Sequence, residues 1–347
     1  MNILIVKLSA IGDVVHTLPS LSAIRDRYPR AHITWVIEEA SADLIANHPA
    51  LDRVLVSRRK GWLRELQRSG KTRPALAEMA EFIRGLRDRS YDVVIDFHGL
   101  FKSALIVALS GGKRKIGYDS MQELSGLFLN EKVPEDMSKH AVDRYLDLAR
   151  HLGADPNRVE FTIAVDNDNR LRVSKLLEAH DINITAPFIA VNPVAFWETK
   201  LWEDEKFARL CDRIGEELDI PVIITGGGGE KRLERIAGMT RGPCVNLQGK
   251  TTLRDLAYLY QKARLVVTTD SGPMHVAAAM GTPVVALFGP TDPVRTGPYG
   301  EGHRVIRKNL PCSPCFLKTC KTMQCMKEIS VDEVFQAVVE KIGNRDS

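Results

Sequence analysis

The segment TTDSGPMHVAAAMGTP, at residues 268–283, carries residue types that bind anions. Pro273 suits the first position of a helix and Gly281 suits its C-terminal stop, which places Ser271 and Gly272 at the helix start. Exposed backbone N–H groups and the helix dipole favour a phosphate at such a point, and glycine lets the phosphate approach the backbone closely. The segment therefore indicates a phosphate site.

The other polar residues of this segment have a simpler interpretation as well. Asp270 and Ser271 could do no more than cap the helix, and His275 could be a hydrogen-bonded core residue. Spacing alone leaves the two interpretations equal. The position directly after an apolar run, which predicts a strand, favours the phosphate site.

Two further segments in this half of the chain follow apolar runs. Four glycines at residues 226–229 permit close approach of a ligand, and Glu230 could accept hydrogen bonds from ribose hydroxyls. The loop matches neither a P-loop nor a dinucleotide fingerprint, and a mobile loop without a ligand is the alternative. Lys200 could be a point charge for a diphosphate leaving group, although a lone surface lysine is usually just solvated.

Asp13 is a lone carboxylate near the other end of the chain. It follows Gly12, shortly after the apolar run at residues 2–6 that predicts an opening strand. In an isolated Gly-Asp pair the carboxylate is expected to cap the next helix. Facing a nucleotide sugar, it could instead take a proton from an acceptor hydroxyl that attacks the anomeric carbon.

The elements that position these groups follow one pattern. Short apolar runs alternate with helical segments, which is typical of a parallel sheet covered on both faces. The pattern is interrupted near residues 165–186 and then restarts, which predicts two doubly wound halves. Ligands of such sheets bind beyond the carboxyl ends of the strands. If the two halves face each other, one crevice would be lined by residues 12–13, 97–99, 192–200, 226–230 and 270–275.

Seven basic residues crowd between positions 58 and 73, where Glu65 is the single acid. A solvated loop is one interpretation, and a docking patch for an anionic acceptor or an acidic membrane surface is the other. No recognised nucleic-acid motif accompanies the patch, so nucleic acid is not an expected partner. The basic residues are Arg58, Arg59, Lys60, Arg64, Arg68, Lys71 and Arg73.

Four of the six cysteines form a C-x2-C-x4-C-x4-C segment at residues 312–325. Four thiolates could hold a structural zinc ion, but the second pair does not have a standard zinc spacing. Reduced or redox-labile thiols are an equal alternative. The chain of 347 residues has a net charge of +4, no signal-peptide pattern and no long apolar run, so we expect a cytoplasmic protein that can be peripheral to a membrane.

Five motifs along the chain form a recognisable combination: KLSAIGDVVHTLP, WVIEEA, DFHGLFKSAL, KHAVDRYLDLA and DSGPMHVAAAMGTPVVALFGPTDP. Together they resemble bacterial lipopolysaccharide heptosyltransferases of glycosyltransferase family 9, and the first resembles heptosyltransferase I more than II. The resemblance covers nearly the whole chain and implies an α/β GT-B fold, with two Rossmann-like domains facing across a cleft. It implies an acceptor-binding domain at residues 1–170, a nucleotide-sugar-binding domain at 171–330, and a final helix at 331–347 that packs back on the N-terminal domain.

The resemblance also implies an activity and a role for each site residue. The activity is inverting transfer of L-glycero-D-manno-heptose from ADP-heptose to a Kdo residue of Kdo2-lipid A or a related lipopolysaccharide precursor. It needs no metal and no cofactor, and it takes place at the cytoplasmic face of the inner membrane. Asp13 matches the catalytic base. The donor-binding residues are Lys200, Glu230, Asp270, Ser271, Gly272 and His275, and the acceptor-binding residues are Ser9, Gly12, Arg59, Lys60 and His140.

Three alternatives stay open at this level. Ala10 stands where heptosyltransferases I often carry serine, which leaves room for a family 9 transferase with a later core position or a different nucleotide sugar. A nucleotide-sugar epimerase could share the two-domain architecture. A zinc-dependent binding module built around the cysteine segment is the alternative that is not an enzyme.

Overall fold

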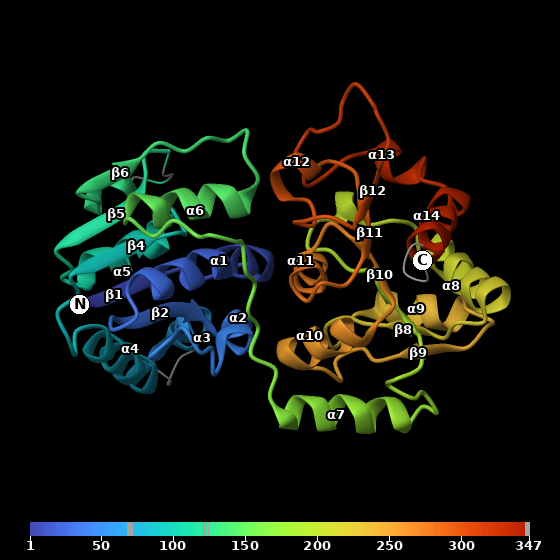
Figure 1. Cartoon of the computed structure of the whole chain (residues 1–347), viewed down its shortest axis with the longest axis horizontal. Helices are drawn as coiled ribbons and strands as arrows, with labels where there is room; N and C mark the ends of the chain where they lie inside the picture. Colours follow the sequence, from blue (N-terminus) through green and yellow to red (C-terminus); the bar gives the residue numbers. More distant parts are fainter. Residues whose placement is uncertain (68–71, 121–122, 124, 344–347) are drawn as a thin grey trace. The chain divides into compact units, whose positions relative to one another are not determined.

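The computed structural model describes residues 1–67, 72–120, 123 and 125–343, and the chain divides into two compact units, Met1–Ala164 and Val165–Ser347 (Figure 1). Each unit is a parallel six-stranded sheet flanked by helices, as the alternation of apolar runs and helical segments predicts. The prediction of two doubly wound halves is confirmed.

The N-terminal sheet has the strand order β3-β2-β1-β4-β5-β6, so the strand order reverses between β1 and β4. Val6, the last residue of β1, pairs with Val36 and Asp96 on the two neighbouring strands. The loops that follow these three strands therefore leave the sheet at the same end, where the strands have their carboxyl ends. The strands are β1 (Asn2–Val6), β2 (His32–Glu38), β3 (Arg53–Ser57), β4 (Val93–Asp96), β5 (Arg114–Tyr118) and β6 (Glu131–Val133).

The C-terminal sheet repeats this plan with the order β12-β11-β10-β7-β8-β9 and reverses between β7 and β10. Thr268 of β10 pairs with Asn192, the last residue of β7, so the loops after these two strands are neighbours. The strands are β7 (Ile189–Asn192), β8 (Val222–Ile224), β9 (Cys244–Asn246), β10 (Leu265–Thr269), β11 (Val284–Phe288) and β12 (Arg304–Arg307).

Helices cover the sheets and bury their apolar residues against them. The N-terminal core gathers side chains such as Leu4, Val36 and Val94, and the C-terminal core includes Trp202 and Val267. The N-terminal helices are α1 (Ile11–Arg27), α2 (Glu39–Ala42), η1 (Asp43–Ile45), α3 (Arg59–Gln67), α4 (Thr72–Leu86), α5 (Phe101–Leu109), η2 (Ser125–Phe128) and α6 (Ala141–His151). The C-terminal helices are α7 (Asn167–Glu178), η3 (Glu198–Lys200), α8 (Asp204–Leu218), α9 (Lys231–Met239), α10 (Leu253–Lys262), α11 (Gly272–Ala279), α12 (Pro293–Thr296), α13 (Gln324–Lys327) and α14 (Val331–Gly343).

The domain boundary differs slightly from the predicted one. The units divide between Ala164 and Val165, six residues before the predicted boundary, because α7 already packs on α10 of the C-terminal unit. Within its own unit, the final helix α14 packs against α8 and strands β10 to β12, and its buried Val334, Phe335 and Val338 belong to the C-terminal core. That this helix also packs back on the N-terminal domain stays a prediction.

Candidate functional site

Asp13 lies in the first turn of α1, just beyond β1, and its two carboxylate oxygens have different environments. The Oδ2 atom accepts a hydrogen bond from the Ala10 N–H at 3.1 Å, so the capping role expected of a Gly-Asp pair is real. The Oδ1 atom accepts a hydrogen bond from the Tyr145 hydroxyl at 3.3 Å. The side chain remains 43% exposed. One oxygen thus anchors the carboxylate to the helix while the group stays open to solvent.

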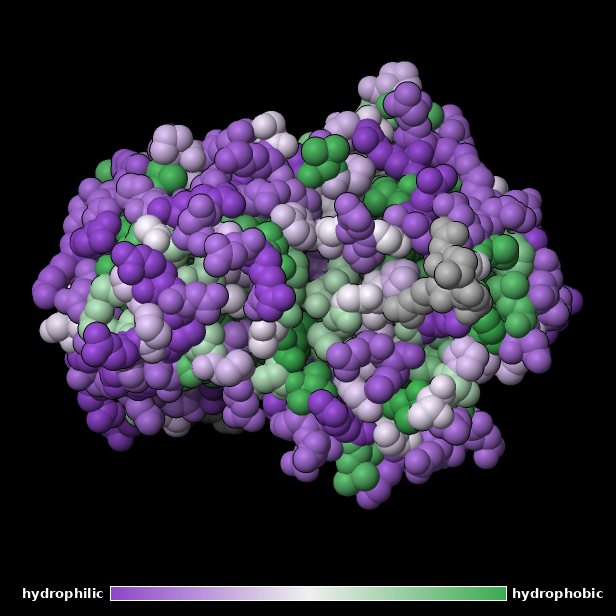
Figure 2. Space-filling view, in the orientation of Figure 1, coloured by the Kyte–Doolittle hydropathy of each residue, from purple (hydrophilic) through white to green (hydrophobic). Residues whose placement is uncertain are grey.

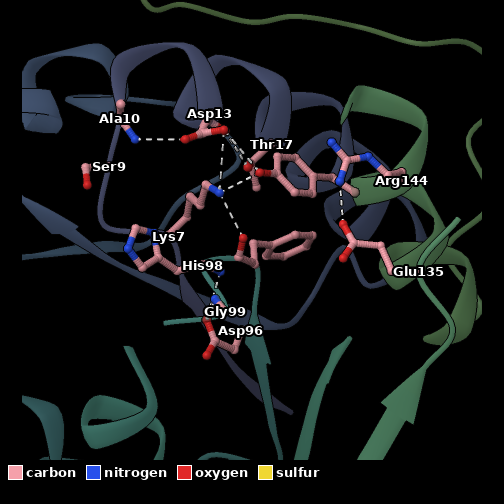
Figure 3. Close-up of polar contacts among 12 residues, drawn as sticks. Lys7, Ser9, Ala10, Asp13, Thr17, Asp96, His98, Gly99, Glu135 and Arg144 are labelled. Carbon is pink, nitrogen blue, oxygen red and sulfur yellow. Dashed lines mark hydrogen bonds and ion pairs between the residues drawn. The ribbon is translucent and has the colours of Figure 1, made fainter. Parts of the chain in front are cut away.

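Lys7 is the residue after β1, and its side chain is only 3% exposed. Its Nζ atom donates to the Phe97 carbonyl at 2.9 Å and to the Tyr145 hydroxyl at 2.6 Å, and it lies 4.0 Å from Oδ1 of Asp13 (Figure 3). Burial lowers the pKa of Lys7, against the opposing effects of Asp13 and Asp96. A buried lysine therefore lies directly behind the exposed carboxylate.

A cavity of about 280 Å³ opens beside Asp13 at the point where the strand order of the N-terminal sheet reverses. Arg144 and Glu135, which form an ion pair, contribute to its wall. His98 lines it as well, and burial lowers the pKa of that imidazole to about 3, so His98 is neutral at physiological pH. The complete lining is Lys7, Asp13, Phe97, His98, Gly99, Leu100, Tyr118, Ser120, Glu135, Met137, Arg144 and Tyr145.

The predicted acceptor residues Arg59 and Lys60 converge on Glu38, the buried last residue of β2. Arg59 lies 3.2 Å and Lys60 3.7 Å from its carboxylate oxygens. Lys102 lies 3.3 Å from Glu38 and also donates to the Ser9 hydroxyl at 3.1 Å. Burial acts to raise the pKa of Glu38, but Lys102 and Arg59 outweigh it and lower that pKa. The basic stretch is therefore partly neutralised by an acid from another segment.

The rest of the basic stretch is less uniform than its sequence suggests. Arg58 forms ion pairs with Glu39 and Glu78, and the indole of buried Trp62 donates to Glu78 at 2.9 Å. From Arg59 to Gln67 the stretch forms α3, and from Thr72 it forms the start of α4. These residues are therefore helical and do not form a solvated loop. Arg68 and Lys71, two members of the predicted patch, lie outside the described residues.

His140 and Gly12 both lie in segments that follow strands of the N-terminal sheet, Gly12 after β1 and His140 after β6, and each has a structural role. His140 precedes α6 and caps it, because its Nδ1 accepts the Val142 N–H at 3.1 Å. Its ring stands edge-on to His16 of α1, with 5.3 Å between centroids. Gly12 is buried within the first turn of α1. The structure thus brings both residues close to the helix that carries Asp13.

The C-terminal unit places Lys200 and Asp270 together where its own strand order reverses. Lys200 Nζ lies 2.6 Å from Asp270 Oδ2, and the Thr291 hydroxyl donates to the same oxygen at 2.6 Å. Asp270 is 5% exposed and Lys200 is 16% exposed. The lysine ammonium also lies 4.6 Å from the centre of the Trp197 ring. A buried acid therefore orients a more accessible cation.

Helix α11 begins at Gly272, as the sequence predicts, and Ser271 is its extended N-cap residue. In the described structure the Ser271 side chain makes no capping hydrogen bond, and its hydroxyl lies 3.3 Å from that of Thr268. Asp270 contacts Lys200 and Thr291, so capping by these two side chains is not what the structure shows. The helix start thus presents backbone N–H groups, such as that of Gly272, that favour an anion. His275 is buried on the first turns of the same helix.

Glu230 is exposed at the start of α9, at the end of the glycine loop. Two glycine positions in this region are fixed by packing. A Cβ atom at Gly226 would lie 2.4 Å from the Leu233 side chain. The backbone of Gly249, at φ +67°, runs next to that of Gly228, and a Cβ atom at Gly249 would lie 2.8 Å from the Gly228 Cα atom. Part of the glycine content therefore serves the loop itself and not a ligand.

Sequence reasoning missed Lys7, Tyr145 and Glu38. A charged residue at the carboxyl end of a buried apolar run was an available signal: Lys7 directly follows β1, and Glu38 is the last residue of β2. Tyr145 had none, since it is 132 residues from Asp13.

Two broader features bear on the alternatives. Among the described residues, which include all four cysteines of the 312–325 segment, no group of His, Cys, Asp and Glu is arranged to hold a metal ion. In the described part of the chain, no helix combines the length and apolar character that a membrane span requires. Hydrophilic residues dominate the face in Figure 2, and apolar residues appear there in scattered groups.

Known proteins resemble this chain over most of its length. The family model for glycosyltransferase family 9 (heptosyltransferase) matches residues 79–326. Lipopolysaccharide heptosyltransferase 1 of Pseudomonas aeruginosa is 32% identical over 324 residues, covering 92% of this chain and 87% of that protein. Its counterpart from Escherichia coli K12 is 30% identical, covering 88% and 93%.

Solved structures agree with the sequence comparison. Escherichia coli heptosyltransferase WaaC with ADP has a TM-score of 0.79 and 27% identity, over 98% of this chain and 100% of that one. A glycosyltransferase family 9 structure from Veillonella parvula, at 24% identity, covers 99% and 97% with a TM-score of 0.84 and supports the fold. The α/β, GT-B-like fold class is thereby confirmed, and the chain belongs to glycosyltransferase family 9, the heptosyltransferases.

Proposed function

We propose that this enzyme transfers L-glycero-D-manno-heptose from ADP-heptose to a Kdo residue of the lipopolysaccharide inner core, with inversion at the anomeric carbon and Kdo2-lipid A as acceptor. The observation that carries the proposal is the accessible Asp13 carboxylate, fixed by one oxygen at the mouth of a polar cavity. Relatives named lipopolysaccharide heptosyltransferase 1 support it, as does the WaaC structure with ADP-2-deoxy-2-fluoro heptose, which is 26% identical.

The reaction assigns a separate task to each unit. Asp13 of the N-terminal unit accepts the proton of the acceptor hydroxyl as that oxygen forms a bond to the anomeric carbon. The bond between this carbon and the diphosphate oxygen breaks, and its electron pair leaves with ADP. Attack from the face opposite the leaving group inverts the anomeric configuration.

The C-terminal unit binds the donor in this proposal. Lys200 and the backbone N–H groups at the start of α11 stabilise the negative charge that grows on the departing diphosphate. Asp270 orients the ammonium group of Lys200, and Glu230 accepts hydrogen bonds from the ribose hydroxyls. Ser271, Gly272 and His275 complete the donor side.

The acceptor meets the basic residues of the N-terminal unit. Arg59 and Lys60, together with Ser9, Gly12 and His140 of the same unit, recognise the lipopolysaccharide precursor, and the two cations bind its anionic groups. Since that precursor is a lipid, we also place the enzyme in the cytoplasm, at the inner face of the membrane. Exposed Leu63 beside these cations supports peripheral contact with anionic lipid.

A panel of acceptors tests the proposal. The enzyme is incubated with ADP-heptose alone, with Kdo2-lipid A, and with an acceptor that already carries heptose, and the ADP released is measured. We expect release that depends on Kdo2-lipid A, together with a product whose anomeric configuration, read by NMR, is inverted. Turnover of the nucleotide sugar without any acceptor would contradict transfer and favour an epimerase.

A later core position is the second candidate. It is favoured by one comparison, because lipopolysaccharide heptosyltransferase 3 of Escherichia coli K12 is 26% identical over 84% of this chain. ADP release with the heptosylated acceptor but not with Kdo2-lipid A would select this candidate.

A further inference from the structure

A chain of polar contacts links Lys7 and Tyr145 to Asp13. The proposed transfer reaction assigns a role to Asp13 but none to the other two residues. Lys7 follows β1, Tyr145 lies on α6 and Asp13 lies on α1, so three elements meet at this point. Lys7 Nζ and the Tyr145 oxygen are 2.6 Å apart, and the Tyr145 oxygen and Asp13 Oδ1 are 3.3 Å apart. The contacts run from the core of the N-terminal unit out to the exposed carboxylate.

The direction of these hydrogen bonds follows from the donors available. A charged lysine has three N–H donors and no acceptor, so Lys7 donates to the Tyr145 oxygen. The Tyr145 proton must then point elsewhere, and Asp13 Oδ1 accepts it. Burial raises the pKa of Tyr145 well above its usual value, so the hydroxyl keeps this proton throughout the physiological range. The chain therefore has one polarity, with its negative end at Asp13.

Burial makes this arrangement more than an incidental surface contact. Lys7 and Tyr145 are both buried, and the Lys7 ammonium also lies 4.4 Å from the centre of the Tyr145 ring. A second bond ties Lys7 to the Phe97 carbonyl at 2.9 Å. Both side chains are thus fixed by their surroundings, whereas Asp13 is partly exposed and is also held through Oδ2, which accepts the Ala10 N–H. Groups fixed in this way can set the position of the second oxygen, Oδ1.

We propose that Lys7 and Tyr145 are positioning residues that orient Oδ1 of Asp13 and keep the carboxylate ionised for proton transfer. The inference rests on the proposed role of Asp13 as base. The Tyr145 hydroxyl stabilises the ionised form by donating a hydrogen bond, and Lys7 does so by its charge and by polarising the hydroxyl.

Other groups act on the same network and must be considered in a pH experiment. Asp13, Asp96, Arg144 and Lys102 all act on the charge of Lys7, and His98 faces both Lys7 and Asp13. Tyr118 and Arg144 act on Tyr145. None of these groups is removed by the change Tyr145→Phe, which deletes only the hydroxyl that contacts Asp13.

Two measurements on Tyr145→Phe test the inference. The first is the pH dependence of kcat/KM with ADP-heptose and Kdo2-lipid A, where we expect the acidic limb to move upward by about half to one pH unit. The second is a ¹³C NMR titration of the Asp13 carboxyl, where the midpoint should move the same way without any need for turnover. Lys7→Met should move both in the same direction.

Tyr118→Phe is the matched control. Tyr118 is another buried tyrosine on the wall of the same cavity, but its hydroxyl donates to the Arg144 carbonyl and not to Asp13. We expect it to leave both midpoints in place, whatever it does to the rate. A rate lost in Tyr145→Phe with both midpoints unchanged would overturn the inference. Failure of the proposed function gives a different result. It would appear as full activity of Asp13→Asn or as no transfer by the wild type. The NMR midpoint of Asp13 could still move as predicted in either case, because that measurement does not depend on turnover.

Discussion

The two strand-end sites of this molecule are built from the same pair of residue types with opposite exposure. In the N-terminal unit the lysine is buried and the aspartate is open: Lys7 is 3% and Asp13 is 43% exposed, with 4.0 Å between the charged atoms. In the C-terminal unit the aspartate is buried, at 5%, and Lys200 reaches further out, at 16%, with 2.6 Å between them. The first arrangement presents a carboxylate and the second presents a cation.

Burial, and not residue type, therefore decides which charge of each pair is accessible to a ligand. Both pairs lie where the strand order of a parallel sheet reverses, so topology treats them alike. A carboxylate with a buried cation behind it is suited to accept a proton. A cation with a buried carboxylate behind it, beside the start of a helix, is suited to bind a diphosphate.

Removing the cation from the C-terminal pair should have a large effect on both ligand binding and stability. Lys200→Met is expected to weaken ADP binding by about tenfold to a hundredfold, because it deletes the charge that we propose to meet the diphosphate. It should also lower the free energy of unfolding by about 3 kcal/mol, since Asp270 is left buried without its ion pair. Calorimetric titration with ADP and urea unfolding measure the two effects.

The double variant Lys200→Met/Asp270→Asn is the control for that experiment. It removes the uncompensated charge, so stability should largely return while ADP binding stays weak. Recovery of ADP binding in the double variant would show that Lys200 serves only the fold.

A buried histidine offers a test of the same principle away from both sites. Burial lowers the pKa of His48 to about 4, below its ordinary value of 6.5, so the unfolded chain binds the proton more tightly than the folded chain does. The stabilisation is therefore present above pH 6.5 and is lost as the pH falls from 6.5 towards 4, by about 3 kcal/mol at most. Urea unfolding between pH 4.5 and 7.5 should show this slope, and His48→Gln should flatten it.

His151 provides the exposed counterpart. It is 38% exposed and lies 3.1 Å from Glu131, so its replacement by glutamine should change the free energy of unfolding at neutral pH by no more than about 1 kcal/mol. A clearly larger loss in urea unfolding would mean that an exposed pair can stabilise the fold as strongly as a buried group.

The smallest effect is expected from the cysteine segment. Cys312 is an exposed free thiol, while the segment is attached to the C-terminal unit by other groups, including the Cys315 N–H to the Pro290 carbonyl at 3.0 Å and the Thr199 hydroxyl to the Leu317 carbonyl at 2.7 Å. Cys312→Ser should change the free energy of unfolding by no more than about 0.5 kcal/mol and leave ADP binding intact. Stoichiometric zinc by elemental analysis, with loss of binding in this variant, would instead make the donor side depend on a metal.

The sequence was sufficient to predict the features that local patterns encode. Apolar runs predict the strands of two parallel sheets, and Pro273 with Gly281 predicts the limits of α11. Asp13 and Asp270 were found because each follows such a run. These signals are local, since they depend on spacing within a few residues.

The missing parts depend on contacts between distant segments. Arg59 and Lys60, at the start of α3, looked like an unneutralised patch because their partner Glu38 lies 21 residues before Arg59, at the end of β2. Tyr145 reaches Asp13 only once α6 has packed on α1. The contacts of α14 have the same character: an amphipathic pattern predicts that one face of the helix is buried, but not that α8 and strands β10 to β12 bury it.

Asp13→Asn is the decisive variant for the proposed proton transfer, with heptose transfer and ADP binding measured on the same preparation. Asparagine keeps the size of the side chain but cannot take the proton from the acceptor hydroxyl. We predict that ADP release from ADP-heptose in the presence of Kdo2-lipid A falls by about a thousandfold, while ADP binding at the C-terminal unit and the unfolding transition stay as in the wild type. Transfer at the wild-type rate by Asp13→Asn would contradict the account.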